Sequence, residues 1–300
     1  MTPELLQTAL ARALASIASV RGVANDRVSD PSIRRSKAQR HGDWVSTIAL
    51  RSAAALHTEP RSLAEEIAVM LREDTRVARV EVAGPGFLNI AVRPSSLAQT
   101  AADIVSAGRT FGPDRATAER IETTVDERIA ASPELWTPHV VGGADARRFM
   151  AARATAEPRH LGDTGFLRTA HPDNPVYFVQ VAHATACRVE RRASSCGIDA
   201  AAFAPDTLTD ATETALAAAL ADFIDTTRRA AASREPQAIT FLLEATSQLF
   251  VDWVNACPVT PNIDEDITEV HASRLVLDRA AIIVLATGLR LLGASAPERI

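Results

Sequence analysis

Two glycines that flank a proline form the first feature of the sequence that could bind a ligand. Gly84-Pro85-Gly86 lies between two segments of alternating apolar residues, and closely spaced glycines can cradle a phosphate group. A dinucleotide-binding loop needs a third glycine and a helix after it, whereas this chain has Asn89 and a second alternating segment. Pro85 also lacks the backbone N–H that would face a phosphate. The pattern therefore favours a tight turn between two strands.

Phe87 and Asn89, which follow this turn, could recognise an unpaired nucleic-acid base. In a strand their side chains share one face, while Leu88 and Ile90 share the other. If the aliphatic pair faces the core, the outward ring can stack on a base and the amide can hydrogen-bond to the base edge. The alternative is that Phe87 packs on a neighbouring helix. The local pattern leaves both interpretations open.

Metal and catalytic sites have little support in the sequence. His183 and Cys187 are four residues apart and would supply half of a zinc site, but no second pair accompanies them. Cys196 and Cys257 complete an odd number of cysteines without a CxxC pair, which excludes a disulfide framework. Asp264-Glu265-Asp266 is typical of a solvated loop. Because no Ser-His-Asp or Cys-His arrangement has a supporting motif, we predict no catalytic residue, no metal and no cofactor.

The charge of the chain is unevenly distributed. The 300 residues carry a net charge of −5, which does not suit a general nucleic-acid or DNA coat protein. Residues 1–112 nevertheless contain 14 basic and 11 acidic side chains, a net charge of +3. Residues 113–138 have a net charge of −3 and residues 139–300 a net charge of −5. A polyanionic partner would therefore meet the N-terminal region first. Lys37 is the only lysine of the chain.

The apolar segments do not predict a membrane protein. Glu4 interrupts the first apolar run, so we expect no signal peptide. The strongest apolar stretch, 280–289, is too short to cross a bilayer. We therefore expect a cytoplasmic protein without a membrane partner.

Periodicity indicates which elements position these residues. Apolar spacing predicts helices over 3–20, 44–56, 60–73 and 94–107, strands over 77–83 and 87–92, and a loop over 25–42. These segments predict an α/β domain over 1–112. Prolines and acidic residues over 113–138 predict a linker with a short helix over 116–130. Helical spacing over 176–195, 207–232, 236–255 and 268–292 then predicts an all-α bundle over 139–300.

Several stretches of the chain resemble one family. His41-Gly42-Asp43-Trp44, Ala64-Glu65-Glu66-Ile67 and 80–90 resemble the N-terminal additional domain of arginyl-tRNA synthetases. The second half resembles the DALR-type anticodon-binding domain of the same enzymes, in Asn174–His183, Ala256–Val259, Arg274-Leu275, Gly288–Gly293 and Ala296–Ile300. The resemblance implies an α/β N-terminal domain followed by an all-α, anticodon-binding-like helical bundle.

The catalytic signatures of that family are missing. In the family a Rossmann-type domain with HIGH and KMSK motifs lies between these two domains, where this chain has the acidic segment 113–138. A KMSK loop needs two lysines, and Lys37 lies in the wrong domain. His160-Leu161-Gly162-Asp163 lacks the second histidine of HIGH. The resemblance therefore implies a non-catalytic paralogue.

The resemblance also implies which residues contact tRNA. Phe87 and Asn89 correspond to the family's pair that reads the D-loop adenosine, and we expect Arg34, Arg35 and Lys37 to attract the RNA backbone.

On the anticodon side, the family's positions correspond to Tyr177, Gln180, His183, Trp253 and Arg274. Val181, Thr185 and Ile300 replace a tyrosine, an arginine and a methionine of the family pattern. These replacements place anticodon reading in doubt and favour contact with the D-loop.

Three functions remain as hypotheses. The first is a non-catalytic tRNA-binding protein, with tRNA(Arg) as one candidate. The second is an interaction or regulatory module that has lost RNA binding and binds a protein, such as the synthetase, or a small molecule. The third is an enzyme with a site rebuilt near Arg147, Arg148 or His160, which no motif supports.

Overall fold

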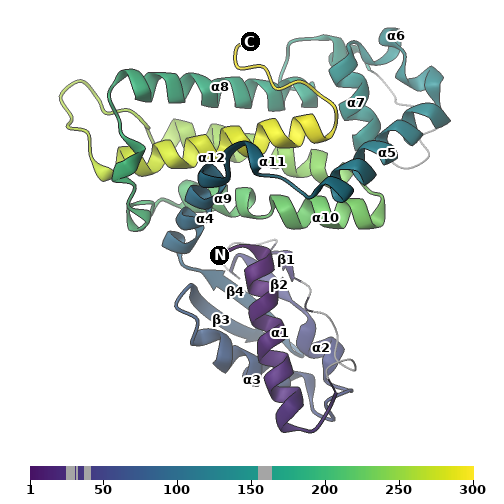
Figure 1. Cartoon of the computed structure of the whole chain (residues 1–300), viewed down its shortest axis with the longest axis vertical. Helices are drawn as coiled ribbons and strands as arrows, with labels where there is room; N and C mark the ends of the chain where they lie inside the picture. The colour runs from purple at the N-terminus through teal and green to yellow at the C-terminus, as the bar shows by residue number, and fades with distance from the viewer. Residues whose placement is uncertain (25–30, 32, 37–41, 155–163) are drawn as a thin grey trace. The chain divides into compact units, whose positions relative to one another are not determined.

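The computed structural model describes residues 1–24, 31, 33–36, 42–154 and 164–300 (Figure 1). Lys37 and His160–Asp163 lie outside the described residues. The chain forms two compact units, Met1–Leu97 and Ala98–Ile300. Among the described helices, none is both long and apolar enough to cross a membrane.

The first unit combines helices with a four-stranded antiparallel sheet. Its elements are α1 (Pro3–Val20), β1 (Ile33–Arg35), β2 (Trp44–Ser46), α2 (Ile48–Ser52), α3 (Pro60–Arg72), β3 (Val77–Ala83), β4 (Phe87–Val92) and the start of α4 (Pro94–Ala107). The strand order is β1-β2-β4-β3. All neighbouring strands are antiparallel.

Hydrophobic periodicity explains how this unit forms its core. Leu6, Leu10 and Leu14 recur every four residues on α1 and are all buried. Leu88 and Ile90 recur every two residues on β4 and are also buried. Figure 1 shows α1 crossing over the sheet, so that the helical and strand periods supply the two sides of one core.

The structure corrects two sequence-based predictions in this unit. The segment 44–56 was predicted as one helix, but it begins as strand β2, in which Trp44 pairs with Ile90 and Ser46 with Leu88. The predicted loop over 25–42 contains β1, which pairs with β2. Both strands are only three residues long. Their periodicity is therefore too short to detect. Pairing decides their conformation, because β2 pairs with the six-residue strand β4 and β1 pairs with β2.

The second unit is helical. Its helices are the rest of α4, then α5 (Arg115–Ala131), α6 (Pro138–Val141), α7 (Ala144–Arg153), α8 (Pro175–Ser195), α9 (Ala211–Ala221), α10 (Phe223–Ser233), α11 (Gln237–Ala256) and α12 (Glu269–Leu291). The 3₁₀ turns η3 (Gly108–Thr110), η4 (Pro133–Trp136), η5 (Gly165–Arg168), η6 (Ala200–Ala202) and η7 (Pro205–Thr207) connect them. The expected helix over 207–232 is divided into α9 and α10 at Asp222. The helical prediction for this half is confirmed.

The segment that was predicted as a linker, 113–138, differs from that description. It forms α5 and η4 within the second unit, and the division between the units lies at Leu97 and Ala98, inside α4. Val125 and Trp136 are fully buried. Acidic residues on the outer side of α5 give the segment a linker-like composition, while its apolar side packs into the bundle.

Arg128 of α5 shows how firmly this segment is held. Its guanidinium is buried and donates hydrogen bonds to the carbonyl oxygens of Ala152 at 3.0 Å, Ala154 at 2.7 Å and Arg234 at 3.2 Å. These carbonyls lie at the C-terminal ends of α7 and α10, where helices leave their last carbonyls without intrahelical partners. Desolvation lowers the pKa of Arg128, and the bonded carbonyls compensate for the loss of water.

Candidate nucleic-acid interface

The Gly84-Pro85-Gly86 segment is a turn between β3 and β4, as predicted. Gly84 has φ +51° and Gly86 has φ +139°, conformations that L side chains rarely adopt. A Cβ atom on Gly86 would lie 2.8 Å from the carbonyl oxygen of Pro60. The glycines are therefore required by the turn and by its close approach to α3. Because a strand, β4, follows the turn instead of a helix, the segment does not have the strand-to-helix connection of a phosphate loop.

The register of the sheet brings together residues that are far apart in the sequence. Val45 of β2 pairs with Arg34 of β1 on one side and with Asn89 of β4 on the other. Asn89 also pairs with Glu81 of β3. Directly opposed residues of antiparallel strands project to the same face, so these residues form one row across the sheet.

Phe87 lies on the same face, because it is two residues from Asn89 along β4. Its side chain is 37% exposed, while Leu88 and Ile90 on the opposite face are fully buried. This confirms the predicted alternation of β4. The face offers an accessible ring, a half-buried amide and the cationic side chain of Arg34. Such a combination can stack a base, hydrogen-bond to its edge and attract a phosphate.

Two further charges affect this face. Glu81, which would repel phosphate, forms an ion pair with Arg79 at 2.7 Å. Both side chains are about half exposed, so solvent weakens the pair. At β3 the positive charge of Arg79 thus offsets the negative charge of Glu81, while at β1 the row keeps the positive charge of Arg34.

Arg34 and Arg35 are adjacent in the sequence but lie on opposite faces of β1. Arg35 pairs with Trp44, and its guanidinium carbon lies 5.7 Å from the centre of the indole ring. Trp44 is buried with Ile90 on the core face. Arg35 is therefore on the other side of β1 from the row that contains Asn89. Of Arg34 and Arg35, the two predicted basic residues that the structure describes, only Arg34 lies on the face with Phe87, and Lys37 lies outside the described residues.

Gly42 and Asp43 position β2 against β4. Gly42 has φ +95°, and a Cβ atom there would lie 2.7 Å from the carbonyl oxygen of Ile90. The backbone N–H of Asp43 donates to that carbonyl oxygen at 2.8 Å, and its carboxylate accepts from the N–H of Val92 at 2.8 Å. Burial raises the pKa of Asp43. Sequence reasoning did not assign this role, although a glycine directly before a short polar residue and a tryptophan is a detectable signal.

Gln180 and His183, predicted on the anticodon side, bind the last residues of this chain. Gln180 Nε2 donates to the carboxylate of Asp145 at 2.7 Å and to the carbonyl oxygen of Ser295 at 3.1 Å. His183 Nδ1 lies 2.9 Å from the carbonyl oxygen of Pro297. Because a carbonyl oxygen can only accept a hydrogen bond, Nδ1 is the donor. Desolvation lowers the pKa of His183, which favours the neutral ring. Both side chains thus hold the segment 293–300 along α8.

Tyr177 lines a pocket of about 480 Å³ between α8 and this terminal segment. Val181, Thr185 and Ile300, the three departures from the family pattern, line the same pocket. The changes are therefore concentrated at one place on the surface.

The charge of this pocket is positive. Its charged residues are Arg188, Arg191, Arg299 and Glu298. Three guanidinium groups against one carboxylate favour an anionic ligand. The pocket could therefore still attract RNA phosphate, although the family's ring and guanidinium at 181 and 185 are replaced.

Trp253 and Arg274 lie away from such a surface. Trp253 is fully buried and packs against Phe250, with ring centres 5.7 Å apart. Arg274 donates to Glu213 at 2.8 Å and to the carbonyl oxygen of Pro258 at 2.9 Å. The resemblance named both as positions on the anticodon side, and the structure places Trp253 on the buried side of α11. Arg274 neutralises a carboxylate that is itself buried.

Cys187 and Arg148, two of the remaining candidates, have local partners in the helical unit. Cys187 Sγ lies 3.7 Å from His183 Nε2, and burial raises the pKa of the thiol to about 11. No group of three His, Cys, Asp or Glu side chains suited to a metal occurs in the part of the chain that the structure describes. Arg148 donates to the carbonyl oxygen of Leu292 at 3.0 Å and pairs with Asp126, so its guanidinium serves packing of the bundle.

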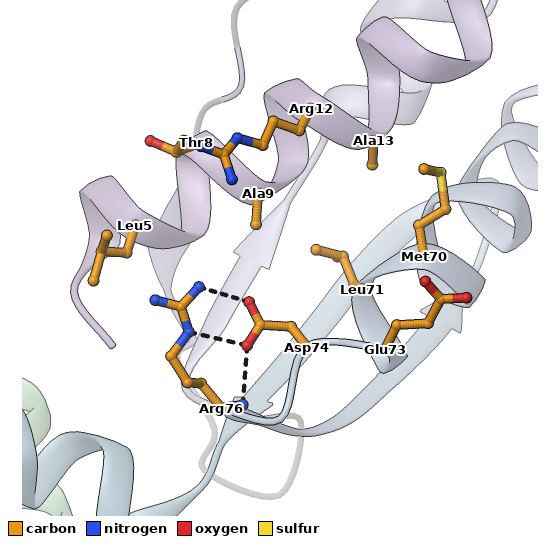
Figure 2. Close-up of a pocket in the computed structure, with 10 residues that line it drawn as sticks. All are labelled: Leu5, Thr8, Ala9, Arg12, Ala13, Met70, Leu71, Glu73, Asp74 and Arg76. Atoms are coloured by element: carbon orange, nitrogen blue, oxygen red, sulfur yellow. Dashed lines mark hydrogen bonds and ion pairs between the residues drawn. The ribbon is translucent and has the colours of Figure 1, made fainter.

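Figure 2 shows a separate pocket of about 360 Å³ in the first unit, between α1 and the connection from α3 to β3. Ala9, Ala13 and Leu71 contribute apolar surface to it. Arg76 binds both carboxylate oxygens of Asp74, at 2.9 Å and 2.7 Å, and this pair lowers the pKa of Asp74. The lining also contains Arg12 and Glu73, so its two guanidinium groups are matched by two carboxylates and the pocket has no excess of positive charge to attract a phosphate.

Two protein families match the sequence. The arginyl tRNA synthetase N terminal domain matches residues 4–92, and the DALR anticodon binding domain matches residues 179–300. Residues 93–178 lie between the two matches.

Similar proteins include two bacterial arginine–tRNA ligases. The ligase of Clavibacter sepedonicus is 41% identical over 157 residues, which are 52% of this chain and 28% of that protein. The ligase of Renibacterium salmoninarum is 42% identical over 157 residues, which are 52% of this chain and 29% of that protein. The match thus spans less than a third of the length of these relatives.

A solved structure shares the fold. Arginyl-tRNA synthetase from Thermus thermophilus aligns with a TM-score of 0.69 and 13% identity, and the alignment covers 100% of each chain. At this identity the likeness shows the fold alone.

Proposed function

Because this chain is an arginyl-tRNA synthetase-related protein, with the N-terminal and DALR domains and no catalytic domain between them, we propose that it binds tRNA without aminoacylating it. Adenylate formation needs cations that stabilise the triphosphate and a nucleotide pocket. The sequence has one lysine and lacks the HIGH and KMSK motifs that supply them in the family.

The face of the sheet that carries Phe87, Asn89 and Arg34 is the observation on which tRNA binding rests. It combines an exposed ring with an amide two residues away and a cationic side chain in the same row as that amide. Family members use an aromatic residue and an asparagine on this strand to read an adenosine of the D-loop. We propose that Phe87 and Asn89 contact the same base in a bound tRNA, while Arg34 contacts the backbone.

The pocket at Tyr177 supports a weaker contact with the anticodon loop. Its excess of guanidinium groups favours phosphate. Val181 and Thr185 remove a stacking ring and a cation, each worth about 1–3 kcal/mol of RNA binding. We therefore propose that the first unit provides the main contact and that the anticodon sequence is read poorly.

Binding of labelled tRNA at two salt concentrations tests this proposal. Fluorescence anisotropy should show tighter binding of tRNA than of a heparin fragment of similar charge, with affinity that falls as salt rises. Equal binding of the two polyanions would contradict base recognition. Arginine-dependent ATP–pyrophosphate exchange above the level of a protein-free control would contradict the non-catalytic assignment.

A protein-interaction module is the second candidate function. Val181, Thr185 and Ile300, the three departures from the family pattern, all line the pocket of Tyr177. Three changes in one pocket alter which ligands the pocket can bind, and this favours the second candidate. Absence of any tRNA binding at low salt, together with a folded protein, would favour this candidate.

A further inference from the structure

An apolar pocket lies at the far end of α8 from Tyr177. It has a volume of about 620 Å³ and lies between η6, η7 and the start of α12. Ala202, Ile267, Val270 and Ala272 contribute its apolar surface. Tyr177 is near the first residue of α8, whereas Gly197, which lines this pocket, follows its end. The pocket of Tyr177 extends along the helix to Arg191, so about 9 Å along α8 separates the nearest lining residues of the two pockets. Figure 1 shows the loop before α12 beside one end of α8, while the terminal segment starts at the other end and runs back along the helix.

The loop beside this pocket exposes two large aliphatic side chains. Ile263 is fully exposed and Ile267 is 47% exposed. All residues from 262 to 269 are exposed, so no described part of the bundle covers these side chains. Two neighbouring isoleucines in water beside an apolar pocket are typical of a surface that a partner covers.

The charges around the pocket are acidic. The charged residues that line it are Asp199 and Glu269, and the loop adds Asp264, Glu265 and Asp266. No arginine or lysine lines the pocket. A partner for this surface must therefore combine apolar side chains with positive charge, and RNA phosphate is repelled from it.

Local contacts hold the loop in this conformation. Glu265 accepts from the backbone N–H of Asn262 at 3.1 Å and lies 3.7 Å from His271 Nε2. His271 in turn accepts from the backbone N–H of Thr268 at 3.1 Å and completes the N-terminal cap of α12. The isoleucines are thus presented from a loop with internal hydrogen bonds, which reduces the entropy that a partner must overcome on binding.

We propose that this pocket and loop bind a basic, amphipathic polypeptide segment of another protein. An apolar side chain of the segment enters the pocket beside Ile267, and its flanking arginine or lysine residues pair with Asp264, Asp266 and Glu269. The site lies in the second unit, whereas the proposed tRNA-binding face of Phe87 lies in the first, and the two share no residue.

The test uses the full chain and a fluorescein-labelled peptide of about 14 residues, four turns of helix, with leucines on one side and arginines on the other. We expect saturable binding at low salt. The double variant Ile263→Ser/Ile267→Ser should weaken binding about tenfold, equivalent to about 1.4 kcal/mol. Asp264→Asn/Asp266→Asn should weaken binding and reduce its dependence on salt. A scrambled peptide with the same charge should bind more weakly than the amphipathic one.

Matched variants separate this site from general effects. Val69→Ser removes an aliphatic side chain that is 57% exposed on α3, and Glu122→Gln removes an exposed acid of α5. Neither should change peptide affinity.

Equal binding of the peptide by the wild type and both double variants overturns the proposal, as does absence of binding. A dimer that Ile263→Ser/Ile267→Ser dissociates in sedimentation would assign the surface to a second copy of this chain instead. Unchanged tRNA affinity in the double variants would show that the two sites are separate.

Discussion

Arg34 of β1 and Asn89 of β4 lie on the same face of the sheet, because each pairs directly with Val45 of β2. The two residues are 55 positions apart in the sequence, and their strands are not neighbours in the sheet. The short strand β2 therefore brings a cationic side chain to the face that carries Phe87 and Asn89.

Replacing Phe87 by alanine should weaken tRNA binding by about 1–3 kcal/mol, the usual contribution of one stacked base. Asn89→Ala should have a smaller effect on affinity and a larger effect on the preference for the base at that position. Fluorescence anisotropy with tRNA variants at the D-loop measures both.

The control for these variants is Ile90→Ala on the opposite face of β4. Because Ile90 is fully buried, its truncation should lower the free energy of unfolding by about 2–5 kcal/mol and leave the affinity of the folded protein nearly unchanged. A Phe87→Ala variant that binds tRNA as the wild type does would refute the D-loop assignment.

Arg34→Gln and Arg35→Gln should differ although the residues are adjacent. Arg34→Gln should reduce the slope of log affinity against log salt by about one unit for one lost phosphate contact. Arg35→Gln should chiefly lower thermal stability, because the guanidinium of Arg35 lies over the ring of Trp44. Anisotropy titrations at several salt concentrations and thermal melts distinguish them, and equal slopes for the two variants would contradict the register argument.

Gly42→Ala should destabilise the first unit by about 1–3 kcal/mol or more. The new Cβ atom would lie 2.7 Å from the carbonyl oxygen of Ile90, and φ +95° is unfavourable for alanine. Gly22→Ala is the matched control, since Gly22 has φ +67° with no neighbouring atom within 4 Å of a Cβ. Urea denaturation should show a smaller loss for the control, and equal losses would mean that β2 does not depend on this close approach.

Arg128→Met should destabilise the second unit by about 3–5 kcal/mol, because the carbonyl oxygens of Ala152, Ala154 and Arg234 lose a buried donor. Arg115→Met on the same helix removes a guanidinium whose side chain is 91% exposed. This control should change stability by about 0.5 kcal/mol or less. Similar urea midpoints for the two variants would contradict the role of Arg128 in holding α5.

The free energy of unfolding of the wild type should fall as pH rises because of Asp278, and the Asp278→Asn variant should not show this fall. Asp278 is buried on α12 without a hydrogen-bond partner for either carboxylate oxygen, and desolvation, reinforced by Glu190, raises its pKa well above the usual value. Arg279 opposes the shift, and Cys187 is the other titratable group affected by this carboxylate.

The direction of this pH dependence is set by whether the folded or the unfolded protein binds the proton of Asp278 more tightly. Since the folded protein binds it more tightly, stability from this group is complete below the unfolded pKa of about 4 and is lost as pH rises toward the folded pKa. The difference in unfolding free energy between Asp278→Asn and wild type should therefore grow above pH 4, by up to about 1.4 kcal/mol per pH unit. Urea titrations from pH 4.5 to 8 measure it. Asp264→Asn, at an exposed position, should show no such trend, and a constant difference for Asp278→Asn would contradict the burial argument.

Local sequence patterns were sufficient for much of the fold. The apolar period of two in β4 predicted that Leu88 and Ile90 face the core while Phe87 and Asn89 face outward. Long helical periods predicted α8, α11 and α12, because many residues contribute to each pattern. The glycines of the turn and the resemblance to arginyl-tRNA synthetases could likewise be identified from the residue types alone.

Only the tertiary structure decided which surfaces these elements leave open. The sequence places Gln180, His183 and Trp253 on helices, but a helical period does not say what covers each side. The terminal segment covers Gln180 and His183, and the bundle core covers Trp253. Likewise, Arg34 joins Asn89 only because a three-residue strand pairs with both neighbours, and such pairing depends on contacts between distant segments rather than on local propensity.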